Sequence, residues 1–183
     1  MRWMFPVIVA ASCSMAVAQA GTGPGSGLED KRMHLETTFT VVVHAPYAET
    51  AELFGPEGER AWAGKHWDPQ FLHPMPGRDE EGAVFTIKHG SLDAVWVIAQ
   101  HDVNARHFRY VYFIPNVMVT TIDVRFESRD LKTTQVTVAY ARTAISPDGD
   151  AHVKAMSEGD QTAGKDWQES IDRYLASRTV TLR

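Results

Sequence analysis

The chain has 183 residues, a formal net charge of −5, 44% hydrophobic residues and 22% charged residues. This is the composition of one ordinary domain that is large enough to bury a core. The pI is near 5.9, and Lys and Arg are scattered rather than gathered in runs. The charge pattern therefore gives no reason to expect nucleic-acid binding or a polybasic membrane patch.

Residues 1–20 have the pattern of a secretory signal peptide. Arg2 gives a positive start, residues 3–17 are uncharged and mostly apolar, and Ala18-Gln19-Ala20 has the small residues that a signal peptidase requires. The apolar stretch is shorter than the roughly 20 residues of a membrane span. We expect export, to the periplasm, with cleavage near Ala20. Two alternatives stay open: an uncleaved N-terminal anchor, and a lipoprotein signal acylated at Cys13.

Residues 21–34 are expected to form a flexible linker, because Gly21–Gly27 reads GTGPGSG. Cys13 is the single cysteine of the chain. After cleavage, residues 35–183 would have no disulfide, no reactive thiol and no cysteine-based metal site. The core of this one predicted domain must therefore be stable without covalent links.

The first half of the predicted domain begins with one strand. The β-branched run Thr37–His44 predicts a strand that stops before Pro46. Two short helices are expected at Tyr47–Leu53 and Glu57–Ala63, and the prolines of residues 67–79 indicate a loop with at most a short extended piece.

The second half is predicted to be an antiparallel meander followed by a helix. Very short connections separate five strand candidates, which dictates antiparallel pairing: Ala83–His89, Asp93–Val103, His107–Pro115, Val117–Ser128 and Thr133–Ser146. A long helix is then expected from about Ala151 to Ser177, since its apolar residues recur at steps of mainly three or four.

The order of these elements resembles the START/Bet v 1-like superfamily, also called SRPBCC or helix-grip proteins, which includes polyketide cyclases. The resemblance rests on residues 39–46 (FTVVVHAP), Ala51-x-Leu53-Phe54, Val136-x-Val138-x-Tyr140, and a final helix with Trp167 and Tyr174-Leu175. Residues 59–69 (ERAWAGKHWDP) with residues 140–143 (YART) are similar to an exported bacterial branch. The resemblance implies an α+β helix-grip fold: a curved antiparallel sheet of six to seven strands around a long C-terminal helix, with two short helices after the first strand.

The resemblance also implies a cavity between the sheet and the C-terminal helix that takes apolar molecules. Strand alternation and hydrophobicity select the inward residues, although Val111 and Phe113 compete with Tyr110 and Tyr112 for the inner face. Four tryptophans could stack on a ligand or belong to the core, and Trp167 is favoured for the cavity. The expected ligand-binding residues are Trp96, Tyr110, Tyr112, Ile122, Val124, Phe126, Val138, Tyr140, Arg142 and Trp167.

Arg142 admits two interpretations, because it follows an apolar face in alternation with Tyr140. It would anchor the polar head of a ligand, or it would form a structural ion pair, with Asp123 as a partner if a bulge shifts the register. The eight histidines include no pair at zinc-binding spacing, so no metal and no cofactor is expected. His89, His101, Tyr110 and Asp123 are candidate acid–base groups, but they form no recognisable catalytic constellation.

Three functions follow from the sequence. The first is an exported binding or transport protein that holds a hydrophobic small molecule or lipid without chemistry, with transient membrane contact and oligomeric state left open. The second is an enzyme of the polyketide cyclase or dehydratase kind that uses the same cavity. The third is a co-chaperone-like adaptor that uses a sheet edge or the loop of residues 67–76, with an exposed apolar patch instead of a cavity.

Overall fold

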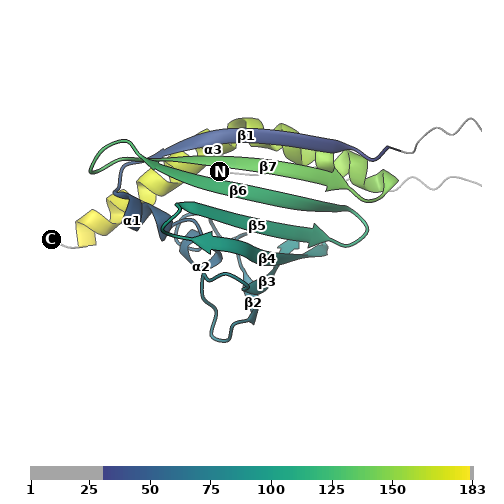
Figure 1. Ribbon diagram of the computed structural model, residues 1–183, viewed down its shortest axis with the longest axis horizontal. Helices are drawn as coiled ribbons and strands as arrows, with labels where there is room; N and C mark the ends of the chain where they lie inside the picture. The colour runs from purple at the N-terminus through teal and green to yellow at the C-terminus, as the bar shows by residue number, and fades with distance from the viewer. Residues whose placement is uncertain (1–30, 182–183) are drawn as a thin grey trace, which may run out of the picture. The chain divides into compact units, whose positions relative to one another are not determined.

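The computed structural model describes residues 31–181. The predicted signal peptide and residues 21–30 of the predicted linker lie outside this range. One antiparallel sheet has the strand order β1-β7-β6-β5-β4-β3-β2 (Figure 1). Its strands are β1 (His34–Val43), β2 (Gln70–His73), β3 (Val84–His89), β4 (Leu92–Asp102), β5 (His107–Ile114), β6 (Met118–Ser128) and β7 (Thr134–Ala144).

Three helices accompany the sheet: α1 (Tyr47–Ala51), α2 (Pro56–Glu59) and α3 (Pro147–Thr181). The two short helices lie where the sequence predicts them, and both are shorter than expected. The long helix begins four residues before the predicted start, because Ser146 caps it. The Ser146 hydroxyl accepts a hydrogen bond from the Gly149 N–H at 3.0 Å, and Pro147 occupies the first helical position, where its missing N–H costs nothing.

The inner face of the sheet is the apolar face that the strand alternation predicts. Ile122 pairs with Tyr140 across β6 and β7, and Val124 pairs with Val138 in the same register. The ambiguity in β5 is settled as well, since Tyr112 is 2% exposed whereas Phe113 is 39% exposed and lies on the outer face. The helix-grip α+β fold is therefore confirmed.

Helix α3 packs along this face against β1, β6 and β7 (Figure 1). Its own residues Val153 and Ile171 are fully buried. Gly164 marks its closest approach to the sheet, because a Cβ atom there would lie 2.8 Å from the Thr40 carbonyl oxygen. The helix thus touches β1 directly at its midpoint.

The folded domain begins slightly earlier than predicted. The Met33 carbonyl accepts a hydrogen bond from the Ala144 N–H at 2.9 Å, and the Met33 N–H donates to Asp150 at 2.8 Å. Met33 and His34, which the sequence analysis placed in the linker, therefore belong to the sheet edge.

Candidate ligand-binding cavity

A cavity of about 50 Å³ lies between the inner face of the sheet, helix α2 and helix α3. We call it the central cavity. Its walls come from seven of the structural elements and two connecting segments, and most of the lining side chains are apolar or aromatic. The lining residues are Phe54, Pro56, Glu59, Trp67, Phe85, Trp96, Tyr110, Ile122, Val124, Tyr140 and Trp167.

Six of the ten predicted ligand-binding residues line the central cavity: Trp96, Tyr110, Ile122, Val124, Tyr140 and Trp167. The other four do not. Tyr112 stacks on the Trp96 ring, with ring centroids 4.3 Å apart. Phe126 packs against Phe54 and Phe108, and Val138 is fully buried in the core. Arg142 is engaged elsewhere, as described below.

Four lining residues were not singled out by the sequence analysis: Phe54, Pro56, Glu59 and Phe85. Trp67 was considered as a stacking residue but not assigned to the site. Phe85 alternates correctly with the buried Ile87 on β3, so strand parity could have found it. The α2 residues carry no such signal, because a helix of four residues shows no periodicity from which an inward face can be read.

Aromatic rings form most of the cavity wall. Trp96 stacks on Phe85 at 5.7 Å and meets Trp67 edge-on at 5.6 Å. On the opposite side, Trp167 packs against Trp62 at 5.2 Å. The buried Trp96 indole N–H has no hydrogen-bond partner within residues 31–181. The site therefore offers several ring faces and edges, with few polar groups.

The polar groups of the cavity are one carboxyl and two phenols. The Tyr110 hydroxyl donates to the Phe54 carbonyl at 2.5 Å, whereas no described group makes a hydrogen bond to the Tyr140 hydroxyl. Glu59 is half-buried, and in the described part of the chain its carboxyl has neither a hydrogen bond nor an ion pair. Burial, together with the nearby negative charge of Asp79, raises the pKa of Glu59 well above its usual value.

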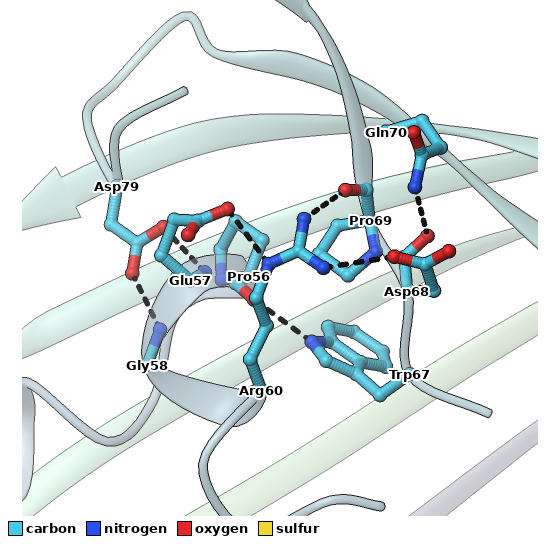
Figure 2. Close-up of polar contacts among 9 residues, drawn as sticks. All are labelled: Pro56, Glu57, Gly58, Arg60, Trp67, Asp68, Pro69, Gln70 and Asp79. Carbon is cyan, nitrogen blue, oxygen red and sulfur yellow. Dashed lines mark hydrogen bonds and ion pairs between the residues drawn. The ribbon is translucent and has the colours of Figure 1, made fainter. Parts of the chain in front are cut away.

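Polar contacts tie α2 to the segment that carries Trp67 (Figure 2). The Trp67 indole N–H donates to the Pro56 carbonyl at 2.9 Å. The Arg60 guanidinium donates to Glu57 at 3.0 Å, to Asp68 at 2.9 Å and to the Pro69 carbonyl. These contacts join residues 56–69 into one unit, which we call the α2 flap and which forms the wall of the cavity opposite the sheet.

A second anchor holds the start of the α2 flap. The Asp79 carboxylate accepts hydrogen bonds from the Glu57 N–H at 2.9 Å and the Gly58 N–H at 3.2 Å (Figure 2). These two bonds satisfy backbone donors that a helix start leaves open. The flap is therefore fixed by these polar contacts and by its two tryptophans, since Trp62 packs on Trp167 and Trp67 packs on Trp96.

Arg142 forms the structural ion pair that was one of its two interpretations, and its partner is Asp160 on α3 rather than Asp123. Its guanidinium donates to both oxygens of Asp160, one at 3.0 Å, and also to the Thr37 hydroxyl at 3.3 Å. Arg142 is 2% exposed. Asp123 lies on the outer face of the sheet, where it binds Arg109 and His107. Arg142 is thus committed to joining β7 to α3.

The remaining acid–base candidates lie away from the cavity, with the exception of Tyr110. His89 stacks on Tyr112 at 5.7 Å, and His101 stacks on Phe108 at 4.1 Å. Within residues 31–181, no group of three His, Cys, Asp or Glu side chains is placed to hold a metal ion. No helix in that range is long and apolar enough to cross a membrane. Leu72 and Met75, in the loop that the adaptor hypothesis involves, are 61% and 75% exposed.

The sheet, the long helix and the cavity between them define the class: this chain has the Bet v 1-like, helix-grip fold of the SRPBCC proteins. Comparison with protein-family models gave no match, and comparison with curated protein sequences gave none either.

Solved structures with this fold show which proteins it is similar to. Norcoclaurine synthase from Thalictrum flavum, in complex with dopamine and hydroxybenzaldehyde, has a TM-score of 0.59 at 9% identity over 88% of this chain and 98% of that chain. Ara h 8.0201 has a TM-score of 0.55 at 13% identity, over 79% of this chain and 99% of its own. A protein from Thermobifida fusca has a TM-score of 0.56 at 18% identity, over 76% of this chain and 92% of that chain. At these identities the similarity concerns the fold.

Proposed function

We propose that this protein binds a small hydrophobic molecule in the central cavity and holds it between the sheet and α3 without chemistry. One observation carries the proposal: the grip helix and the sheet leave a cavity whose wall consists almost entirely of aromatic and aliphatic side chains. Concave apolar sites with few polar groups are typical of small-molecule binding. The solved structures with the same fold include norcoclaurine synthase bound to dopamine and hydroxybenzaldehyde, which are small molecules.

The size of the cavity favours a compact aromatic ligand over a long-chain lipid. At about 50 Å³ it is smaller than the roughly 150 Å³ apolar cavity that takes benzene in an engineered protein. A single ring therefore requires one wall to move. The α2 flap is the wall that belongs neither to the hydrogen-bonded sheet nor to α3, so we propose that the ligand enters as the flap shifts outward.

A compact ring is expected to bind weakly. Burying six or seven carbon atoms gives a gross gain of roughly 5 kcal/mol, and association costs at least about 4 kcal/mol. The net gain is then about 1 kcal/mol or less, so dissociation constants for bare aromatic probes should be weaker than about 1 mM. A physiological ligand would need further contacts, and a polar one is considered in the next section.

Titration with benzyl alcohol tests the proposal, with binding followed by isothermal calorimetry. Val124→Ile adds one methylene to the cavity wall and should weaken binding about tenfold, because the added group competes with the ligand for space. Val95→Ile makes the same change on the outer face, where Val95 is 36% exposed, and should leave binding unchanged. Equal affinity of the two variants would place the ligand outside the central cavity.

Export is the second part of the proposal, and it rests on the pattern of residues 1–20. The mass of the protein recovered from the periplasm of its own host tests it. A chain that begins at Gly21 supports cleavage after Ala20. Native mass spectrometry of the same sample, followed by solvent extraction, would identify any small molecule that the protein retains.

Acid–base catalysis in the same cavity is a second candidate function, and one observation favours it. Glu59, with its raised pKa, shares the cavity with the hydroxyls of Tyr110 and Tyr140, and a carboxyl that keeps its proton to a higher pH than a free one can act as a general acid. Arg142 cannot serve as the electrophile of such a site, because Asp160 holds it. Turnover that disappears in Glu59→Gln, while ligand affinity persists, would support an enzyme.

A further inference from the structure

Glu59 is the single carboxyl in the wall of the central cavity. Its side chain faces aromatic rings, and within the described residues it makes no hydrogen bond and no ion pair. Glu59 is half-buried, and a carboxyl that loses part of its hydration against aromatic rings without gaining a partner costs stability. No contact that builds the fold offsets this cost, since the backbone of α2 is capped by Asp79 instead.

The nearest cation in the sequence does not neutralise Glu59. Arg60 follows it directly, but Arg60 does not line the cavity, and its guanidinium is held by Glu57, Asp68 and the Pro69 carbonyl (Figure 2). No Lys, Arg or His lines the central cavity. The acidic group is thus left without a counter-charge on the side that a ligand would occupy.

The rings around Glu59 are suited to a positive charge. Trp67, Trp96 and Trp167 line the same cavity, and the faces of indole rings attract organic cations. A carboxylate and an ammonium group form a charge-assisted hydrogen bond, which is stronger than a bond between neutral groups. A ligand that brings an amine would therefore supply the missing partner of Glu59 and would also gain from the aromatic wall.

We propose that the central cavity selects organic amines that carry an apolar or aromatic body, with the ammonium group at Glu59 and the body against Trp96 and Trp167. This inference rests on the proposed binding function and names its ligand class. The ligand enters as the ammonium ion, and the Glu59 carboxylate accepts a hydrogen bond from the ammonium group. Where Glu59 is protonated before binding, its proton passes to the solvent. No covalent bond forms or breaks apart from this proton transfer.

The other titratable groups that face Glu59 are consistent with this exchange. Tyr110 on β5 and Tyr140 on β7 are phenols whose pKa is raised well above the usual value, first by burial and also by the charge of Glu59. Arg142 opposes the rise at Tyr140, but its charge is paired with Asp160. Both phenols remain neutral hydroxyls at physiological pH. Asp79 is acidic and also disfavours ionisation of Glu59. None of these groups supplies a positive charge, so the ligand must.

Calorimetric titration with benzylamine and with benzyl alcohol tests the inference, since the two probes share size and ring but differ in charge. We expect the native protein to bind benzylamine about tenfold more tightly than benzyl alcohol at pH 7. Glu59→Gln should abolish this preference and keep the affinity for benzyl alcohol. Glu52→Gln, an exposed acidic residue between α1 and α2, is the matched control and should keep the preference.

A second measurement does not depend on any variant. Because the pKa of Glu59 is raised, benzylamine binding at pH 5 in two buffers of different ionisation enthalpy should show release of protons, and benzyl alcohol binding should show none. Equal affinity of the native protein for both probes, or an equal loss of both in Glu59→Gln, would overturn the inference and leave the binding function standing. Failure of the native protein to bind either probe would overturn the binding function itself, and the inference with it.

Discussion

At the scale of single residues, Arg142 shows how a buried charge is accommodated by this fold. Its guanidinium and the carboxylate of Asp160 are 3% and 12% exposed, so neither charge is hydrated once its partner is removed. Arg142→Met should lower the free energy of unfolding by about 3–5 kcal/mol, because it leaves Asp160 as an uncompensated buried charge. Urea unfolding at pH 7 measures this loss.

The double variant Arg142→Met, Asp160→Leu is the control for that measurement. It removes both charges and should recover most of the stability, since an apolar pair of similar volume often replaces a buried ion pair without loss. If the free energy of unfolding of Arg142→Met lay within about 1 kcal/mol of the native value, the structural role of the pair would be contradicted.

Glu59 makes the stability of the domain depend on pH in a predictable direction. Burial raises its pKa from the usual 4.5, so the folded chain keeps this proton to a higher pH than the unfolded chain. Between the two pKa values the folded state binds more protons, and stability falls as the pH rises. Glu59→Gln removes this effect, so its stability relative to the native protein should increase steadily from pH 4.5 upward.

Urea unfolding of Glu59→Gln and the native protein across pH 4–8 measures the difference. The exposed Glu52→Gln variant should differ from the native protein by less than about 0.5 kcal/mol at every pH. A Glu59→Gln difference that stays constant with pH would show that the carboxyl titrates as if it were in water.

The sequence alone left the roles of Arg142 and Glu59 open. Strand alternation predicted that Arg142 shares a face with Tyr140, but its partner depends on the rotation of α3 about its axis, which the sequence pattern defines only broadly. Glu59 was part of the segment that carried the family resemblance. Its inward orientation follows from the capping of α2 by Asp79, a contact between residues that no local pattern connects.

At the scale of elements, two glycines of α3 test how closely the grip helix approaches the sheet. A Cβ at Gly164 would lie 2.8 Å from the Thr40 carbonyl oxygen, whereas a Cβ at Gly159 would meet nothing within 4 Å. Gly164→Ala should destabilise the domain by about 1–2 kcal/mol, since the helix must move off β1. Gly159→Ala should stabilise it by about 0.5–1 kcal/mol through helix propensity. Thermal unfolding of the pair distinguishes them, and an equal response would contradict the close contact.

The α2 flap is the element that we expect to move. Arg60→Ala removes its contacts with Glu57, Asp68 and Pro69. Arg60 is partly exposed, so global stability should fall by less than about 1 kcal/mol, while local opening of the flap becomes easier. Hydrogen exchange should show faster exchange of residues 56–69 and unchanged protection of β5 and β6. Faster exchange throughout the sheet would show that the flap is part of the global folding unit.

The elements were predictable to different degrees for a physical reason. Six strands and the long helix were predicted within a few residues, because each repeats its apolar pattern several times. The short helices and β2 were less well defined, since four or five residues contain too little repetition. These same segments supply Pro56, Glu59 and Trp67 to the cavity, so the wall that was hardest to predict is also the one proposed to admit the ligand.

At the scale of the whole molecule, the order of elements was sufficient to predict the helix-grip fold. The apolar faces of the strands must be buried, and the long helix that the sequence offers within residues 31–181 is α3, which covers β1, β6 and β7. What the order of elements does not determine is how much space remains between the two layers. That depends on how side chains such as Trp96 and Trp167 interlock, and the outcome is a cavity of about 50 Å³.

The crystal structure of the protein soaked with 4-bromobenzyl alcohol tests the central claim most directly, because anomalous scattering locates the bromine without reference to any assumed site. We predict a bromine peak inside the central cavity, between Trp96, Tyr140 and Trp167, with the α2 flap displaced outward. A bromine peak at another site, with the central cavity closed and empty, would contradict it.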